Sequence, residues 1–118
     1  MDKKYVLLVG DPEYSARLNF KEFFEQGFVL HWAKSLAQAQ RLLAEGSSFD
    51  LLILEASADP HGTDDFCKSI KKSHAWLKIA YFMDHRTPPR DCVDLLLDPT
   101  DTQAELVVRL RDLFESAA

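Results

Sequence analysis

The sequence predicts an α/β fold in which helices cover both faces of a parallel, five-stranded sheet. Five short and nearly continuous apolar runs are typical of strands that are buried on both sides. Segments with apolar residues at helical spacing separate most of these runs, and capping residues and glycines mark their ends. Such an alternation implies right-handed crossovers and a doubly wound, three-layer α/β/α arrangement.

The predicted strands are defined by their apolar side chains. In chain order they are Tyr5–Val9, Phe28–Trp32, Phe49–Leu54, Ile79–Met83 and Val93–Leu97. None contains a glycine or a proline, which would weaken a central strand.

The predicted helices have recognisable starts and stops. They are residues 13–26 ending at Gly27, a helix capped by Ser35, a helix from Thr63 to about Lys72, and a last helix capped by Asp101 or Thr102. Between Met83 and Val93 the pair Pro88-Pro89 forbids a regular helix. We therefore expect the fourth crossover to be a loop, or a single turn at most.

The length, composition and net charge of the chain limit the functions that are expected of it. A chain of 118 residues with 47% hydrophobic residues predicts one domain over residues 1–118. The net charge is -5 and the basic residues form no cluster beyond Lys3-Lys4 and Lys71-Lys72, so neither a nucleic acid nor a membrane is an expected partner. A protein partner or a small ligand fits this composition better. The N-terminal segment also lacks the apolar stretch of a secretory signal or a spanning helix.

The two cysteines, Cys67 and Cys92, have no CxxC or metal-ligand spacing. This indicates a reducing, cytoplasmic setting with free thiols. On the inner face of its helix, Cys67 is expected to be a small core hydrophobe. Cys92 follows the Pro88-Pro89 segment, so it is expected to be the more open and more reactive thiol.

Motifs for common enzyme chemistries are missing. The sequence has no GxGxxG, GxxxxGK[ST], GxSxG or HExxH pattern, so we do not expect an enzyme. The four histidines have no partner at helical spacing and are not expected on a metal. His61, His74 and His85 lie in predicted loops and are expected at the surface, whereas His31 lies on a predicted strand and is expected to point at a covering helix or toward an edge.

Ligands of doubly wound sheets bind outside the carboxyl ends of the strands, where this sequence has several acids. On the stretches KKYVLLVGDPEYSARL, GFVLHWAKSLAQAQRLLAEGSSFDLLIL, DDFCKSIKK and DLLLDPTDTQAEL, the chain resembles the receiver domain of two-component response regulators. The resemblance covers essentially the whole chain. It implies a flavodoxin-like fold with strand order 2-1-3-4-5, with the family's fourth helix shortened or replaced by a loop.

Receiver domains carry two acids for Mg²⁺ after the first strand, a phosphoacceptor aspartate after the third, a hydroxyl after the fourth, and a lysine before proline after the fifth. The resemblance places different residues at most of these positions. They are Gly10 and Asp11 for the acid pair, Glu55 for the phosphoacceptor, Met83 for the hydroxyl, Asp98 before Pro99 for the lysine, and Leu95 for the aromatic switch residue.

These replacements oppose phosphoryl transfer. Asp98 in place of a lysine reverses two units of charge where the transferred group needs positive charge. Glu55 is one methylene longer than aspartate, which misplaces the in-line geometry. The sequence therefore predicts a pseudo-receiver that signals through protein contact without conventional phosphorylation. Its expected partner face is the last strand, the last helix and the 84–92 loop.

The sequence also allows alternatives to a pseudo-receiver that signals through protein contact. Asp11 and Glu55 could hold a weak Mg²⁺ ion, and together with Asp98 they would form a regulatory site for a divalent or small cationic ligand. A docking or dimerisation module of a larger regulator, with weak homodimer formation, is a further alternative. Permanent imitation of the phosphorylated state by Glu55 is another, although Met83 offers no hydroxyl to bind the charge.

Overall fold

The computed structural model describes residues 3–10, 19–46, 48–54, 60–82, 92–97 and 102–115. Within these ranges the chain forms five strands and four helices. In order they are β1 (Lys4–Val9), α2 (Phe20–Glu25), β2 (Phe28–Ala33), α3 (Leu36–Ala44), β3 (Leu51–Leu54), α4 (Pro60–Ser73), β4 (Lys78–Phe82), β5 (Leu95–Leu97) and α5 (Gln103–Glu115).

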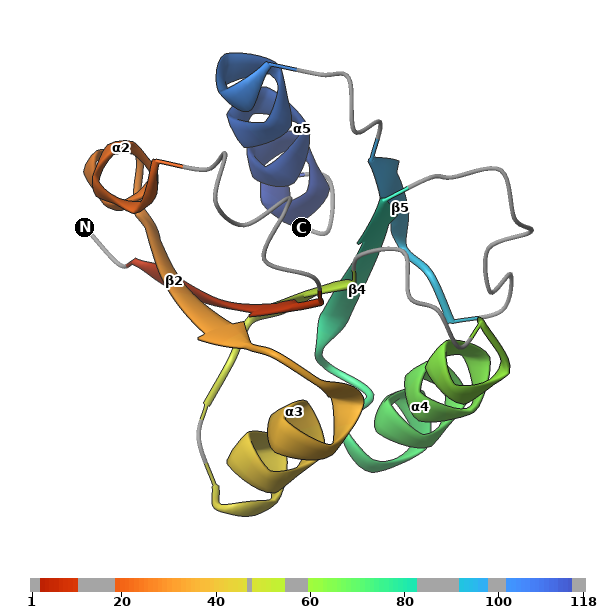
Figure 1. The fold of residues 1–118 in the computed structure, drawn as a ribbon. Helices are drawn as coiled ribbons and strands as arrows, with labels where there is room; N and C mark the ends of the chain where they lie inside the picture. The colour runs from red at the N-terminus through yellow and green to blue at the C-terminus, as the bar shows by residue number, and fades with distance from the viewer. Residues whose placement is uncertain are drawn as a thin grey trace.

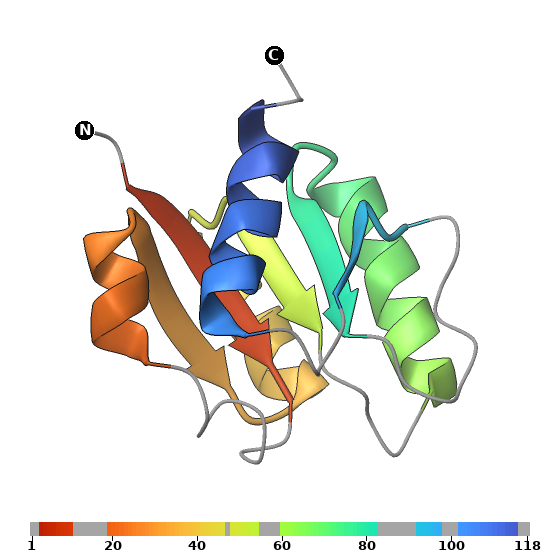
Figure 2. The same ribbon diagram turned by 90° about the horizontal axis from the view of Figure 1, so that it is seen from above.

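All strands are parallel and their order is β2-β1-β3-β4-β5. Helices α2 and α5 cover one face of the sheet, and α3 and α4 cover the other (Figures 1 and 2). The three-layer, doubly wound fold with order 2-1-3-4-5 that the sequence predicts is therefore confirmed. No helix of the described ranges is both long enough and apolar enough to cross a membrane.

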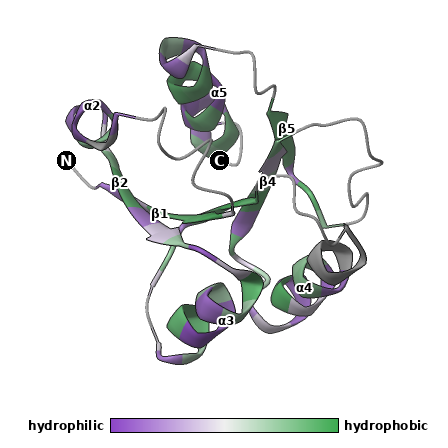
Figure 3. Cartoon of the chain, in the orientation of Figure 1, coloured by the Kyte–Doolittle hydropathy of each residue, from purple (hydrophilic) through white to green (hydrophobic). Residues whose placement is uncertain are grey.

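Alternate residues of each strand enter two separate cores. In β1, Val6 and Leu8 pack under α2 and α5, while Leu7 and Val9 pack under α3 and α4. The strands are mainly hydrophobic, with hydrophilic stretches on β2 and β4, and each helix carries both hydrophobic and hydrophilic residues (Figure 3). Strands buried on both faces explain why the sequence shows continuous apolar runs rather than alternation.

Two aspartates begin strands in the same way. Asp50 precedes β3: its N–H donates to the Tyr5 carbonyl at 2.8 Å, and its Oδ2 accepts from the Tyr5 N–H at 2.8 Å. Asp94 precedes β5 and forms the same pair of bonds with Ile79, at 2.7 and 2.8 Å. Each carboxylate accepts the N–H that a strand carbonyl would otherwise accept. This is why β3 and β5 begin at Leu51 and Leu95, later than the apolar runs predict.

The helix caps at Ser35 and Thr102 are confirmed. The Ser35 Oγ accepts from the Gln38 N–H at 3.1 Å, as the capping pattern predicts. Of the two candidates for the last helix, Thr102 is the cap. Its Oγ1 accepts from the Glu105 N–H at 3.2 Å, and the Glu105 carboxylate accepts from the Thr102 N–H at 3.2 Å.

The predicted start of the third helix at Thr63 is wrong, because α4 begins at Pro60. Proline suits the first helical turn, where its fixed φ is helical and its missing N–H has no partner to lose. Of the helix predicted over 13–26, the described part is α2, which is capped by Asn19 and followed by Gly27 at a φ of 97°. Residues 11–18 and 84–91, with Pro88-Pro89, lie outside the described residues.

Candidate functional site

The carboxyl ends of four strands lie along one edge of the sheet. Val9 pairs with Leu54, Leu54 with Tyr81, and Phe82 with Leu97, so these strands end within one or two residues of one another. Five positions predicted from the receiver resemblance follow directly and lie outside the described residues: Asp11, Glu55, Met83, Asp98 and Pro99. Gly10 and Leu95 are described.

Gly10 is held in a backbone conformation that favours glycine. Its φ is 147°, a value that side-chain-bearing residues rarely adopt. Its N–H donates to the Ala33 carbonyl at 3.1 Å, and its carbonyl accepts the indole Nε1–H of Trp32 at 3.3 Å. The end of β2 thus fixes the main chain at the position predicted to correspond to an acid of receiver domains. Hydrogen bonds with β2 therefore hold the main chain at Gly10, which also carries no carboxylate.

Gly10→Asp, which introduces the acid predicted from the receiver resemblance, is expected to destabilise the fold by about 1–2 kcal/mol, because the new side chain would meet a strained φ. Urea unfolding of the variant and the parent measures this difference. Gly46→Asp is the matched comparison, because Gly46 also has a positive φ, of 84°, and nothing within 4 Å of an added Cβ. A Gly10→Asp protein as stable as the parent would show that the main chain relaxes freely at this edge.

Leu95, predicted to stand at the switch position, contributes to the core. It is half-buried, pairs with Ala80 of β4, and packs against the core under α2 and α5. An aromatic switch residue has a ring that can turn between the interior and the surface. Leu95 has no ring, so this position offers an apolar contact only.

Metal ligation has no support within the described ranges. They contain no group of three His, Cys, Asp or Glu side chains placed to hold an ion. Gly10 supplies no carboxylate, although Mg²⁺ sites are built on carboxylate oxygens. A weak ion on Asp11 and Glu55 stays a prediction, because both residues lie outside the described part of the chain.

The described histidines have local partners. His31 is exposed on β2, where its ring lies 6.3 Å from that of Tyr5 and 5.5 Å from that of Phe49. His74 shares a hydrogen bond of 2.8 Å with the Ser73 hydroxyl and contacts the Trp76 ring. The side chain of His61 and all of His85 lie outside the described residues.

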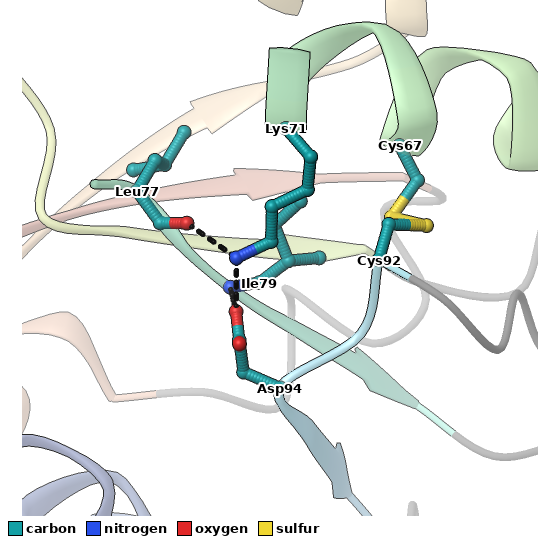
Figure 4. A network of polar contacts seen from close by, with 6 residues as sticks. All are labelled: Cys67, Lys71, Leu77, Ile79, Cys92 and Asp94. Carbon is teal, nitrogen blue, oxygen red and sulfur yellow. Dashed lines mark hydrogen bonds and ion pairs between the residues drawn. A yellow bond between two sulfur atoms is a disulfide. The ribbon is translucent and has the colours of Figure 1, made fainter. Parts of the chain in front are cut away.

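The prediction for the cysteines is wrong. Cys67 and Cys92 form a disulfide, and neither is a free thiol (Figure 4). Cys92 is not open either, since it is 2% exposed, and Cys67 is fully buried as predicted. The pairing connects α4 with the segment before β5. Spacing along the chain gives no signal for it, because the contact arises from the packing of α4 against that segment.

A polar network joins the same two segments. Lys71, one turn after Cys67, donates to Asp94 Oδ2 at 2.7 Å and to the Leu77 carbonyl at 3.0 Å (Figure 4). Asp94 Oδ2 also accepts the Ile79 N–H. The Lys71 and Asp94 side chains are 25% and 26% exposed, so the ion pair is only partly screened by water. Sequence reasoning missed this network.

The edge strand β5 and helix α5 present apolar side chains to solvent. Leu96 is 39% exposed and Val108 is 56% exposed. Val108 lines an open hollow on α5 together with Ala104, Glu105 and Arg109. Leu96 lies between Leu95 and Leu97, which enter the core under α2 and α5, so its side chain points to the side of the sheet away from α5. We call edge strand β5 together with this hollow on α5 the β5/α5 face. It coincides with the described part of the predicted partner face.

A second pocket, of about 360 Å³, lies where β1 begins and α2 ends, and several of its lining residues are cationic. Lys3 donates to the Phe24 carbonyl at 3.2 Å, and Arg111 donates to the Gln26 side chain at 2.7 Å and to its carbonyl at 3.4 Å. Helix α2 has no basic residue in its own last turn. These two side chains therefore supply the positive charge that favours a helix C-terminus, and the pocket has a structural explanation.

Solved structures share this fold over almost the whole chain. The signal receiver domain of an HD domain-containing protein from Pseudomonas fluorescens Pf-5 aligns with a TM-score of 0.80 and 20% identity, covering 98% of this chain and 90% of that chain. A two-component response regulator from Clostridium difficile aligns at 0.79 and 16%, covering 98% of each chain. The non-phosphorylated HemR receiver domain from Leptospira biflexa aligns at 0.72 and 24%, covering 94% of each.

The comparisons of sequence found no match, whereas the comparison of structures did. No protein-family model matches the chain, and no curated protein is similar enough in sequence to be matched. At identities of 24% and below, the structural likeness establishes the fold.

Proposed function

We propose that this chain, which has the fold of response regulator receiver domains, is a non-enzymatic signalling domain that acts through protein contact without conventional aspartyl phosphorylation. The single observation that supports this most is Gly10. Ala33 and Trp32 fix the main chain there in a conformation suited to glycine. One acid of the pair found in working receivers is therefore replaced by a residue that has no carboxylate.

The residue types at the other pocket positions support the same proposal. Glu55, Met83 and Asp98 stand where a receiver uses aspartate, a hydroxyl and lysine. Phosphoryl transfer depends on fixed positive charge at the oxygens of the transferred group, and an aspartate in place of the lysine repels that group. A chain that keeps the fold but loses this chemistry retains its surfaces as the means of signalling.

The proposed partner surface is the β5/α5 face, continued by the 84–92 segment. Its exposed apolar side chain on α5, Val108, costs free energy while it contacts water, and a partner that covers it recovers that free energy. Glu105 and Arg109 flank Val108 on α5 and give the surface a polar border. A central apolar contact with a polar border is the usual composition of a protein interface. We place this signalling in the cytoplasm, as one domain over residues 1–118.

The experiment that tests the contact is site-specific photo-cross-linking in living cells. A photoreactive residue at Val108 is expected to give a discrete cross-linked species, because that position lies at the centre of the proposed face. The same residue at Arg41, an exposed position on α3, is the matched control and is expected to give none.

Each outcome of the cross-linking is informative. A Val108 adduct at twice the mass of the chain identifies a homodimer and supports the docking alternative. An adduct of another mass identifies a different protein as partner. Equal labelling from Val108 and Arg41, or none from either, would contradict the proposed face.

A further inference from the structure

The disulfide joins two segments that are far apart in sequence. Cys67 lies in the middle of α4, and Cys92 lies in the segment that leads into β5, 25 residues later. Their Cα atoms are 5.8 Å apart, within the ordinary range for a disulfide. These are the two cysteines of the chain, so an intramolecular bond between them has no competing thiol within the same molecule.

The disulfide holds the segment that leads into edge strand β5. This strand is three residues long and pairs with β4 alone. Two connections from α4 hold the segment before it: the Cys67–Cys92 bond, and one turn further along the helix the Lys71–Asp94 ion pair. Figure 4 shows both reaching the same short segment. The ion pair involves neither sulfur, so reduction of the disulfide would remove one of these two connections and leave the other.

We infer that Cys67 and Cys92 form a reversible redox pair that controls how firmly β5 and the β5/α5 face are held. The inference rests on the proposed function, because the proposed receiver-like signalling role, and not the cysteine pattern, places the pair in a reducing compartment. Disulfides that form there are mostly transient and redox-sensing rather than structural. The reduced pair is accommodated as two small buried hydrophobes in the core under α3 and α4.

The oxidation requires a low-molecular-weight disulfide such as oxidised glutathione. The Cys92 thiolate attacks one sulfur of that disulfide, breaks its S–S bond and releases one glutathione thiolate. The Cys67 thiolate then attacks the Cys92 sulfur of the mixed disulfide and releases the second glutathione. Two cysteine thiols lose two protons and two electrons, and one glutathione disulfide gains them. Both sulfurs are buried, so the exchange requires local opening of the segment before β5. Cys92 reacts first because it lies in that irregular segment, whereas Cys67 lies within a helix.

The test follows both the thiols and the mobility of β5 in the folded protein. The chain is equilibrated in buffers that run from reduced to oxidised glutathione, trapped by alkylation and weighed by mass spectrometry. Hydrogen exchange is measured on the two end states. We expect a reversible two-thiol transition, with amides of residues 92–97 exchanging about tenfold more slowly in the oxidised form, while those of α3 are unchanged. Lys71→Met is the matched variant, which removes the ionic connection and keeps the thiol pair.

Three results would overturn the inference. The disulfide could resist reduction until the protein unfolds, which would make it structural. Both thiols could stay reduced in excess oxidised glutathione. The transition could occur with no change in exchange at residues 92–97. None of these readouts needs a partner or a phosphoryl donor, so their failure is separate from failure of the proposed function. Cross-linking from Val108 in the oxidised and reduced states then tests whether the redox state reaches the partner.

Discussion

Reduction of the Cys67–Cys92 disulfide is expected to lower the free energy of unfolding by about 3 kcal/mol, with the folded structure otherwise retained. The bond closes a loop over a sequence separation of 25 residues. Closing a loop of that length removes conformational entropy from the unfolded chain, which accounts for an effect of this size. Guanidinium unfolding of the wild-type protein with and without a reductant measures it, and no substitution is needed.

The double variant Cys67→Ala/Cys92→Ala controls for effects of the reductant itself. Its unfolding midpoint is expected to be the same with and without reductant, and close to that of the reduced wild-type protein after allowance for the lost side-chain volume. A wild-type midpoint that does not respond to reductant, while mass spectrometry shows the thiols to have been freed, would mean that the bond contributes nothing to stability.

Asp94→Ala is expected to destabilise the protein by about 2 kcal/mol. One carboxylate oxygen accepts both the Ile79 N–H and the Lys71 ammonium, so the substitution leaves a partly buried main-chain donor and a lysine without their acceptor. Chemical denaturation measures the change. The loss should be accompanied by faster hydrogen exchange at Ile79 and along β5, because Asp94 is the point at which β5 joins β4.

Two further variants separate the contributions of Asp94. Asp94→Asn keeps an oxygen acceptor for the Ile79 N–H and loses the ion pair, which is partly exposed, so it is expected to cost about 1 kcal/mol or less. Asp50→Ala removes the equivalent main-chain contact to Tyr5 without a lysine partner. If Asp94→Asn were as damaging as Asp94→Ala, the ion pair rather than the main-chain contact would hold β5.

The sheet was predictable because its strands are buried on both faces and its helices have strong end signals. Val6 and Leu7 enter opposite cores, which is why a continuous apolar run marks this strand. The caps at Ser35 and Thr102 follow from side chains that bond their own helix. Pro60 escaped prediction because Thr63, with acids after it, gave an equally good start signal by sequence alone.

Only part of the candidate site could be predicted from the sequence. The replaced residue types at the strand ends can be seen in the sequence, since each follows an apolar run. The conformation of Gly10 cannot, because it depends on the Trp32 indole from a neighbouring strand. Asp50 and Asp94 share the pattern apolar-Asp-Leu-Leu, a repeated signal that could have indicated their common role. The Cys67–Cys92 bond has no local signal, since only the packing of α4 brings the two residues together.

The central claim, that this receiver fold works without aspartyl phosphorylation, is tested most directly by NMR in beryllofluoride and Mg²⁺, which together mimic the phosphorylated state. An ordinary receiver domain in the same buffer serves as the positive control. We predict that the amide resonances of Gly10 and Leu95 do not move in this chain, because the site that we propose lacks the second acid and has Asp98 in place of the lysine. Saturable shifts at those amides, together with an acid-labile adduct after treatment with acetyl phosphate, would contradict the account.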